Sequence, residues 1–298
     1  LARSDRPRTA NLLLCEAMAL GDAIEVRDGT THALAGDIAL SLHRGDAARH
    51  HYTAAISFDD GYADNAQVAL PILRRHGLPA TFFIASAFLD GGRMWNDTVI
   101  ECLRATARDS VDLSAFGLGQ ARLGRLDQRR SAIEALLPKV KYMPLAARED
   151  ALARLLDSCA APRLPDGLMM SSDEVRQLHR AGMEIGGHTA RHPILGELSA
   201  AEAEQEIRDG RAALQNLIDA PVDVFAYPNG QPHRDYRAEH VEIVRRLGFR
   251  GAVSTAPATA TPASDRYQLP RATPWDMPAW RWSARLVAGL GRTDAERV

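Results

Sequence analysis

Short apolar segments alternate with segments of helical periodicity from residue 54 onward in this 298-residue chain. Residues 54–58 and 81–85 are apolar enough to form buried strands, and hydrophobic side chains between them recur at helical spacing. A helix that joins two such strands makes a βαβ unit, in which the strands run parallel. The alternation continues with three more expected strands, at 183–187, 222–226 and 251–254. The sequence therefore predicts an α/β fold, either a barrel or a doubly wound sheet, with its chemistry at the carboxyl ends of the strands.

One long segment, residues 90–165, interrupts this alternation. Helical patterns recur within it, near 98–107, 128–140 and 146–158. We expect a helical insertion on a loop of the scaffold, where it would help to shape a ligand cleft. Trp95, Asn96 and Asp97 either line that cleft or form the capped start of a helix.

The composition excludes several classes of protein. With 36 basic and 38 acidic side chains, the chain has a net charge of -2 and lacks the basic excess that binding to nucleic acid requires. No apolar run approaches the ~18 residues of a membrane span. Cys15, Cys102 and Cys159 lie far apart, without Cys-x-x-Cys spacing, which favours buried free thiols over disulfides or a thiolate zinc site.

The N-terminal residues resemble an export signal only in part. Arginines precede a short run of leucines, but Glu16 interrupts the apolar stretch, so we interpret residues 9–20 as a short helix or packing arm. A cytoplasmic location is the default expectation. A periplasmic or exported protein is the alternative if a leader precedes Leu1.

Two acidic side chains, Asp59 and Asp60, follow the expected strand at 54–58 and precede Gly61. Adjacent residues at a strand end point in different directions, so one carboxylate could bind a metal while the other accepts a proton. The alternative is an ordinary Asp-Gly turn, in which the side chain bonds its own backbone.

Two histidines, His188 and His192, follow the strand at 183–187. The glycines before them and Pro193 after them favour a loop over a helix. Two imidazoles and one carboxylate form a sound ligand set for Zn²⁺ or a similar divalent ion and leave one position open. The alternative is a pair of histidines in ordinary hydrogen bonds.

The two motifs strengthen each other because parallel strand ends meet at one edge of a sheet. A third strand end, before Pro228, Asn229 and Gly230, forms a rigid turn that could present a backbone N–H to a ligand, or is simply a turn.

Three segments, in this order and spacing, resemble the polysaccharide deacetylase family, also called the chitooligosaccharide deacetylase homology domain. They are Ile56-Ser57-Phe58-Asp59-Asp60-Gly61-Tyr62-Ala63-Asp64-Asn65, His188-Thr189-x-x-His192 and Phe225-Ala226-Tyr227-Pro228-Asn229-Gly230. The resemblance covers roughly residues 53–275. It implies a deformed (β/α) barrel of about seven parallel strands, with residues 53–298 as the deacetylase domain and residues 1–52 as an arm packed on it.

The resemblance also implies roles for individual residues. Asp59 corresponds to the catalytic base, and Asp60, His188 and His192 correspond to the metal ligands. The backbone N–H of Asn229 corresponds to a catalytic hydrogen-bond donor. The implied cofactor is a divalent metal, Zn²⁺ first, with Co²⁺ or Ni²⁺ as alternatives.

Further residues are expected to contact a sugar substrate, namely Tyr227, Pro228, Arg271 and Trp275. The sequence also departs from the family pattern. Ala226 stands where many members carry the arginine that orients the base, and Arg271 is a candidate replacement. No histidine follows His240, although many members use a late histidine as general acid. His233 or His240 could take that place, or both are ordinary surface or helix residues.

The resemblance implies a hydrolase of carbon-nitrogen bonds other than peptide bonds, which removes acetyl groups from N-acetylated glycans such as exopolysaccharides. Its expected partner is therefore a glycan, with no nucleic acid and no membrane span. The alternatives are an O-acetyl esterase or another amide hydrolase on the same scaffold, or a glycan-binding member that has lost turnover.

Overall fold

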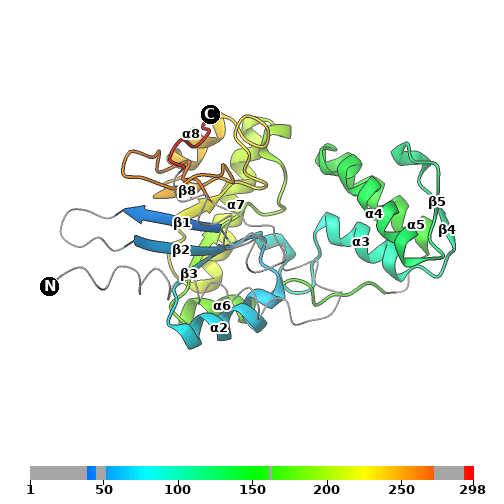
Figure 1. Ribbon diagram of the computed structural model, residues 1–298, viewed down its shortest axis with the longest axis horizontal. Coiled ribbons are helices and arrows are strands. Elements are labelled where there is room, and N and C mark those ends of the chain that lie inside the picture. Colours follow the sequence, from blue (N-terminus) through cyan, green and yellow to red (C-terminus); the bar gives the residue numbers. More distant parts are fainter. Residues whose placement is uncertain (1–38, 45–51, 161–162, 272–291) are drawn as a thin grey trace.

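A curled sheet in the order β1-β2-β3-β6-β7-β8 forms the centre of the fold (Figure 1). The computed structural model describes residues 39–44, 52–160, 163–271 and 292–298. Within these ranges five neighbouring strands run parallel and β1 pairs antiparallel with β2 at the edge. The strands are β1 (Ala39–Arg44), β2 (Tyr52–Phe58), β3 (Ala80–Ile84), β6 (Glu184–Gly187), β7 (Val224–Ala226) and β8 (Gly251–Val253).

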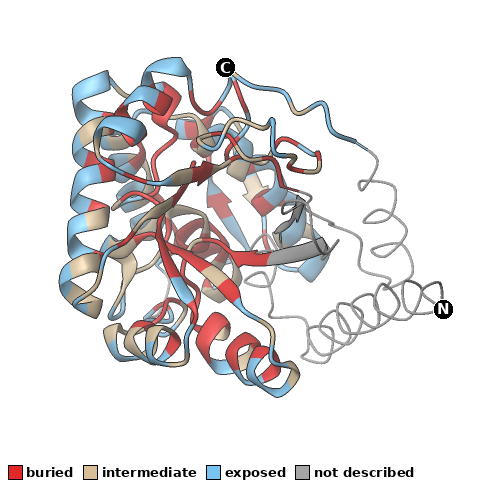
Figure 2. Ribbon diagram, turned by 90° about the vertical axis from the view of Figure 1, so that its left-hand side faces the viewer, coloured by how far each residue is buried: buried red, intermediate tan, exposed pale blue. Residues whose placement is uncertain are grey.

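Helices cover the outer face of this sheet. They are α2 (Leu70–His76), which continues a π-helical turn (Asn65–Ala69), α6 (Ser172–Arg180), α7 (Ala200–Ile218) and α8 (Ala238–Arg246). Their inner faces are buried and their outer faces exposed, as Figure 2 shows. Capping boxes begin α6 and α7, where Ser171 and Ser199 each accept a hydrogen bond from the backbone of the glutamate three residues later.

The main core lies between the sheet and these helices. Phe58 of β2 and Phe82 of β3 are register partners, and their rings stack with centroids 4.9 Å apart. Such aromatic cross-strand pairs help to fix strand register, and this pair sets the position of the last residue of β2 relative to β3. That end is followed directly by Asp59 and Asp60.

The segment between β3 and α6 forms a second body of helices. It contains α3 (Trp95–Ala105), β4 (Ser110–Asp112), β5 (Gln120–Arg122), α4 (Leu126–Lys141) and α5 (Leu145–Cys159). Short 3₁₀ turns lie at Ser86–Phe88 and Ser114–Phe116 in this segment and at Leu195–Glu197 after it. These elements lie to one side of the sheet in Figure 1 and enclose a hydrophobic cluster of their own. Three helices were expected here, and the β4-β5 hairpin was not.

The expected deformed (β/α) barrel is confirmed, with five of the about seven expected parallel strands lying in the described residues. Cys102 and Cys159 are buried free thiols, as expected. Cys15 and the expected helix or arm at 9–20 lie outside the described residues. Among the helices that the structure describes, none has both the length and the apolar character needed to cross a membrane.

Candidate metal centre

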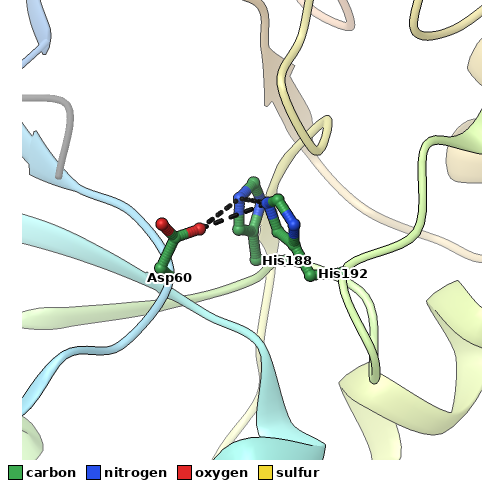
Figure 3. Close-up of side chains that lie close together, drawn as sticks. All are labelled: Asp60, His188 and His192. Carbon is green, nitrogen blue, oxygen red and sulfur yellow. Dashed lines mark hydrogen bonds and ion pairs between the residues drawn. The ribbon is translucent and has the colours of Figure 1, made fainter. Parts of the chain in front are cut away.

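The ends of β2 and β6 bring three metal-ligating side chains together (Figure 3). Asp60 Oδ1 lies 3.4 Å from His188 Nε2 and 3.2 Å from His192 Nε2, and the two imidazole Nε2 atoms are 3.1 Å apart. The Asp60 side chain is 22% exposed, whereas the two histidine side chains are nearly buried. One ligand atom from each side chain therefore faces a shared point that solvent can reach from the carboxylate side.

The backbone turn after β2 aims Asp60 at this point. Asp60 has φ 72° and Gly61 has φ 94°, both in the left-handed region. A Cβ atom at Gly61 would lie 2.9 Å from the Ile84 side chain, so the turn requires glycine there on two counts. The Asp60 carbonyl accepts a hydrogen bond from the N–H of Ala85 at 3.2 Å, which ties the turn to the end of β3.

The ring of His188 is held in one tautomer. Its Nδ1 lies 2.7 Å from the carbonyl oxygen of Ala226, so Nδ1 carries the proton and donates it to that carbonyl. The Nε2 atom is then left with a lone pair facing the centre. A backbone carbonyl that fixes the tautomer in this way is a usual partner of a metal-ligating histidine.

Helix α7 supports the loop that carries His192. A Cβ atom at Gly210 would lie 2.4 Å from the carbonyl carbon of Thr189, so helix and loop backbones are in direct contact. Glu206 accepts hydrogen bonds from the loop at its carbonyl oxygen, from Ala190 N–H at 3.0 Å, and at its carboxylate, from Arg191 N–H at 2.9 Å. His192 N–H donates to Thr189 Oγ1 at 3.0 Å, which closes the loop on itself.

The electrostatics of the centre favour neutral imidazole at His192 and ionised carboxylate at Asp60. Burial lowers the pKa of His192 to about 4, against the attraction of Asp60. Burial would raise the pKa of Asp60, but electrostatic attraction to the His192 and His188 rings and a hydrogen bond with His188 outweigh it, so this pKa lies below its usual value. A carboxylate and an imidazole with free lone pairs are the ligand states that a divalent cation requires.

The donor set also fits a cation on structural grounds. With Nδ1 of His188 protonated, its Nε2 lone pair lies 3.1 Å from the second imidazole nitrogen. His192 Nδ1 is buried and has no hydrogen-bond partner among the described residues. A divalent ion between the three ligand atoms would satisfy both Nε2 lone pairs and the carboxylate together.

Asp59, the residue before Asp60, pairs with Arg271. The guanidinium Nη1 and Nη2 atoms donate to Asp59 Oδ1 and Oδ2, each at 2.7 Å, and Arg271 Nε donates to the carbonyl of Ser254 at 3.1 Å. Both side chains are almost fully buried. Arg271, expected to contact substrate or to replace the missing arginine at Ala226, therefore lies against Asp59.

The third strand end places its residues differently. Asn229 has φ 60°, is half-buried, and its N–H has no hydrogen-bond partner among the described residues, as its expected donor role requires. Pro228 is buried beside it. Tyr227 is 0% exposed, its hydroxyl donates to the Tyr267 carbonyl at 3.0 Å, and its ring stacks on Tyr236, so its side chain packs in the core. A sugar contact by Tyr227 stays a prediction.

The other expected residues divide into described and undescribed ones. Trp275 lies outside the described residues. His240 is fully buried, and its Nδ1 accepts a hydrogen bond from the Arg237 N–H at 2.9 Å at the start of α8. His233 is exposed, with Nε2 4.0 Å from Glu296. Neither histidine belongs to the Asp60, His188 and His192 cluster.

The start of the inserted helix α3 forms a hydrogen-bond network with the turn after β2, which the sequence patterns did not predict. Tyr62, two residues after Asp60, donates a hydrogen bond to Asp97 Oδ1 at 3.3 Å and accepts one from Asn96 Nδ2 at 3.2 Å. Burial raises the pKa of the Asp97 carboxyl to about 7. The start of α3 is thus attached to the turn that carries Asp60.

Comparisons with known proteins agree with these motifs. The family model described as polysaccharide deacetylase matches residues 46–119 and 147–252, together more than half of the chain. The Bacillus subtilis (strain 168) protein named "Putative polysaccharide deacetylase YxkH" is 19% identical over 216 residues, which are 72% of this chain and 49% of that protein. The chain therefore spans about half the length of this curated relative.

Two solved structures have a chain course partly similar to this one. IcaB from Ammonifex degensii has a TM-score of 0.48 and 16% identity, with 92% of this chain and 88% of that chain covered. The Streptococcus pyogenes deacetylase PplD, in complex with acetate, has a TM-score of 0.47 and 16% identity, with coverage of 78% and 68%. On the extent of the family match, the chain belongs to the polysaccharide deacetylase family.

Proposed function

We propose that this chain is a metal-dependent hydrolase that removes acetyl groups from N-acetylated sugars of a polysaccharide or oligosaccharide and releases acetate. The observation that carries the proposal is that one ligand atom each of Asp60, His188 and His192 lies within 4.8 Å of the other two. These three residues would hold the ion, Zn²⁺ first and Co²⁺ or Ni²⁺ as alternatives. Membership of the polysaccharide deacetylase family supports the same chemistry.

A divalent ion bound there supplies Lewis acidity, which activates water and polarises an acetyl carbonyl. Asp59 is the base that accepts the proton of the attacking water. Its two oxygens are held by Arg271, so the carboxylate has a fixed orientation in a buried position.

The N–H of Asn229 is the proposed hydrogen-bond donor to the acetyl oxygen as negative charge develops on it. It is aimed by the left-handed backbone of Asn229 and Gly230, which follow the rigid Pro228. Loss of one such donor typically costs about 10²–10³ in rate. A free amino sugar and acetate are the products.

Acetate release from N-acetylglucosamine oligomers, with and without a chelator, tests the proposal. The metal-loaded chain should release acetate, the chelated chain should not, and Zn²⁺ or Co²⁺ should restore release. The Asp59→Asn variant should retain bound metal while losing turnover, because the base is removed and the ligands are kept. Acetate release from O-acetylated oligomers alone would select an esterase instead, and normal turnover by Asp59→Asn would contradict the assigned base.

A further inference from the structure

Arg148, on the inserted helix α5, holds its guanidinium in a buried position beside the metal centre. The residue is only 4% exposed. Its guanidinium carbon lies over the indole ring of Trp95, the first residue of α3, at 5.4 Å from the ring centroid. Two inserted helices therefore meet at this cation–π pair.

The guanidinium has no hydrogen-bond acceptor and no carboxylate within ion-pair distance among the described residues. Glu206 of α7, which supports the His192 loop, is already used: its Oε1 lies 2.7 Å from Arg191 Nε and its Oε2 accepts the Arg191 N–H. Glu149 and Glu206 attract the Arg148 charge only from a distance, and burial lowers the pKa of Arg148. None of its nitrogens is among the fully enclosed atoms without a partner, so the five N–H donors stay open to a ligand that supplies acceptors.

Arg148 lies close to the loop that carries His192. Together with Pro193 and Ile194, which directly follow His192, it lines a small cavity of about 10 Å³. Its positive charge also acts on His192. The unpartnered donors thus lie next to the loop that carries a proposed metal ligand.

Among the described residues, no carboxylate forms an ion pair with Arg148, in contrast to two other arginines near the centre. Arg271 is neutralised by Asp59, and Arg191 by Glu206. A neutral glycan would leave the buried Arg148 charge without a counter-ion, whereas a carboxylate would neutralise it. A guanidinium packed on an aromatic ring keeps the N–H edge that binds a planar carboxylate through two hydrogen bonds.

We propose that Arg148 binds a carboxylate of the glycan, so that the substrate is an acidic polysaccharide in which a uronic acid neighbours the N-acetylated sugar. This inference rests on the proposed deacetylase function and names its substrate class. Arg148 is a specificity residue here and takes no part in the bond-breaking step.

A matched pair of glycans tests the inference. One is a tetrasaccharide of alternating N-acetylglucosamine and glucuronate, and the other is the same tetrasaccharide with its carboxylates reduced to alcohols. Affinities are measured by calorimetry on metal-loaded Asp59→Asn protein, in which turnover is expected to be absent. The same background carries Arg148→Met or, as the control, Arg154→Met, which removes an exposed arginine from the same helix.

The Asp59→Asn protein should bind the acidic tetrasaccharide about ten-fold or more tightly than the reduced one, as expected for a desolvated, bidentate ion pair. Arg148→Met should bring the ratio close to one, and Arg154→Met should leave it unchanged. Arg148→Lys, which keeps the charge and loses the planar fork, should give an intermediate ratio.

Equal affinities for the two glycans in the Asp59→Asn protein would overturn the inference without any Arg148 variant, as would undetectable binding of the acidic glycan. A ratio that persists in a folded Arg148→Met protein would also overturn it. Acetate release by the wild-type chain is assayed separately on both glycans. Its absence on both would contradict the proposed function, whereas the affinity ratio alone decides the role of Arg148.

Discussion

The guanidinium of Arg271 binds both carboxylate oxygens of Asp59 from a position 212 residues later in the chain. Arg271 Nη1 also donates to Ser57 Oγ at 3.1 Å, so the arginine joins the segment that follows β8 to the end of β2. Ala226 has no side chain that could do this. Both side chains of the pair are almost fully buried, and the charge of Arg271 offsets the loss of hydration around the Asp59 carboxylate.

Replacing Arg271 by Met should both destabilise the chain and slow the reaction. It leaves Asp59 as an uncompensated buried charge, which typically costs about 3–5 kcal/mol. Acetate release should fall by about 10²-fold or more, because Asp59, the proposed base, would lose its orientation. Urea unfolding and acetate assays check both effects, with the exposed Arg266→Met as the control. Wild-type stability and rate in Arg271→Met would contradict the role given to the pair.

Gly210→Ala should weaken metal binding although the site of substitution lies on a helix. Alanine normally favours a helix over glycine by about 1 kcal/mol. Here the added Cβ would lie 2.4 Å from the carbonyl carbon of Thr189, so α7 must move away from the His192 loop. We expect a loss of stability of about 1–3 kcal/mol and a lower Zn²⁺ affinity.

The control for this variant is Gly167→Ala, where a Cβ would meet nothing within 4 Å. Thermal unfolding and Zn²⁺ titration of both variants provide the comparison. A Gly210→Ala chain that is more stable than wild type, with unchanged Zn²⁺ affinity, would show that the helix and loop are not in contact as described.

Asp97 should make the stability of the chain depend on pH. Burial raises its pKa to about 7, with Asp60 and Glu101 acting in the same direction and Tyr62 and Arg93 opposing them. Because the folded-state pKa is above the unfolded value, the folded chain keeps a proton that the unfolded chain has lost. This contribution to stability is complete below about pH 4 and is lost as pH rises through about 7.

Asp97→Asn cannot ionise, so it should remove this dependence. Between pH 4.5 and pH 8 the wild-type chain should lose on the order of 3 kcal/mol relative to Asp97→Asn. Urea unfolding at several pH values measures the difference, and Asp150→Asn, at an exposed position on α5, is the control. A pH-independent difference between wild type and Asp97→Asn would mean that the carboxyl is not buried in the folded chain.

The sequence predicted the parts of the site that follow local patterns. Buried strands have recognisable apolar runs, and a parallel sheet brings their carboxyl ends to one edge, so Asp60 and the two histidines could be placed together before any coordinates. The loop conformation at His188 could also be predicted, because glycines precede it and Pro193 follows His192. Arg271 could be proposed as a partner of Asp59 only because Ala226 departs from the family pattern.

Other features depend on tertiary contacts that leave no local signal. β4 and β5 have three residues each, too few for a strand period to be recognised. Gly210 reads as an ordinary weak helix residue until the Thr189 backbone is seen against it. Arg148 is one of many arginines in amphipathic helices, and only the packing of α5 on α3 shows that it is buried. Tyr227 follows β7 within a motif, and only the fold shows its ring stacked on Tyr236.

A metal titration tests most directly whether Asp60, His188 and His192 form one cation site. The purified chain, stripped with a chelator and dialysed against Zn²⁺, should retain a single ion per chain by elemental analysis. Asp60→Ala, His188→Ala and His192→Ala should each lose that ion while remaining folded by circular dichroism. A wild-type chain that retains no divalent metal, or folded variants that retain as much as wild type, would contradict the site.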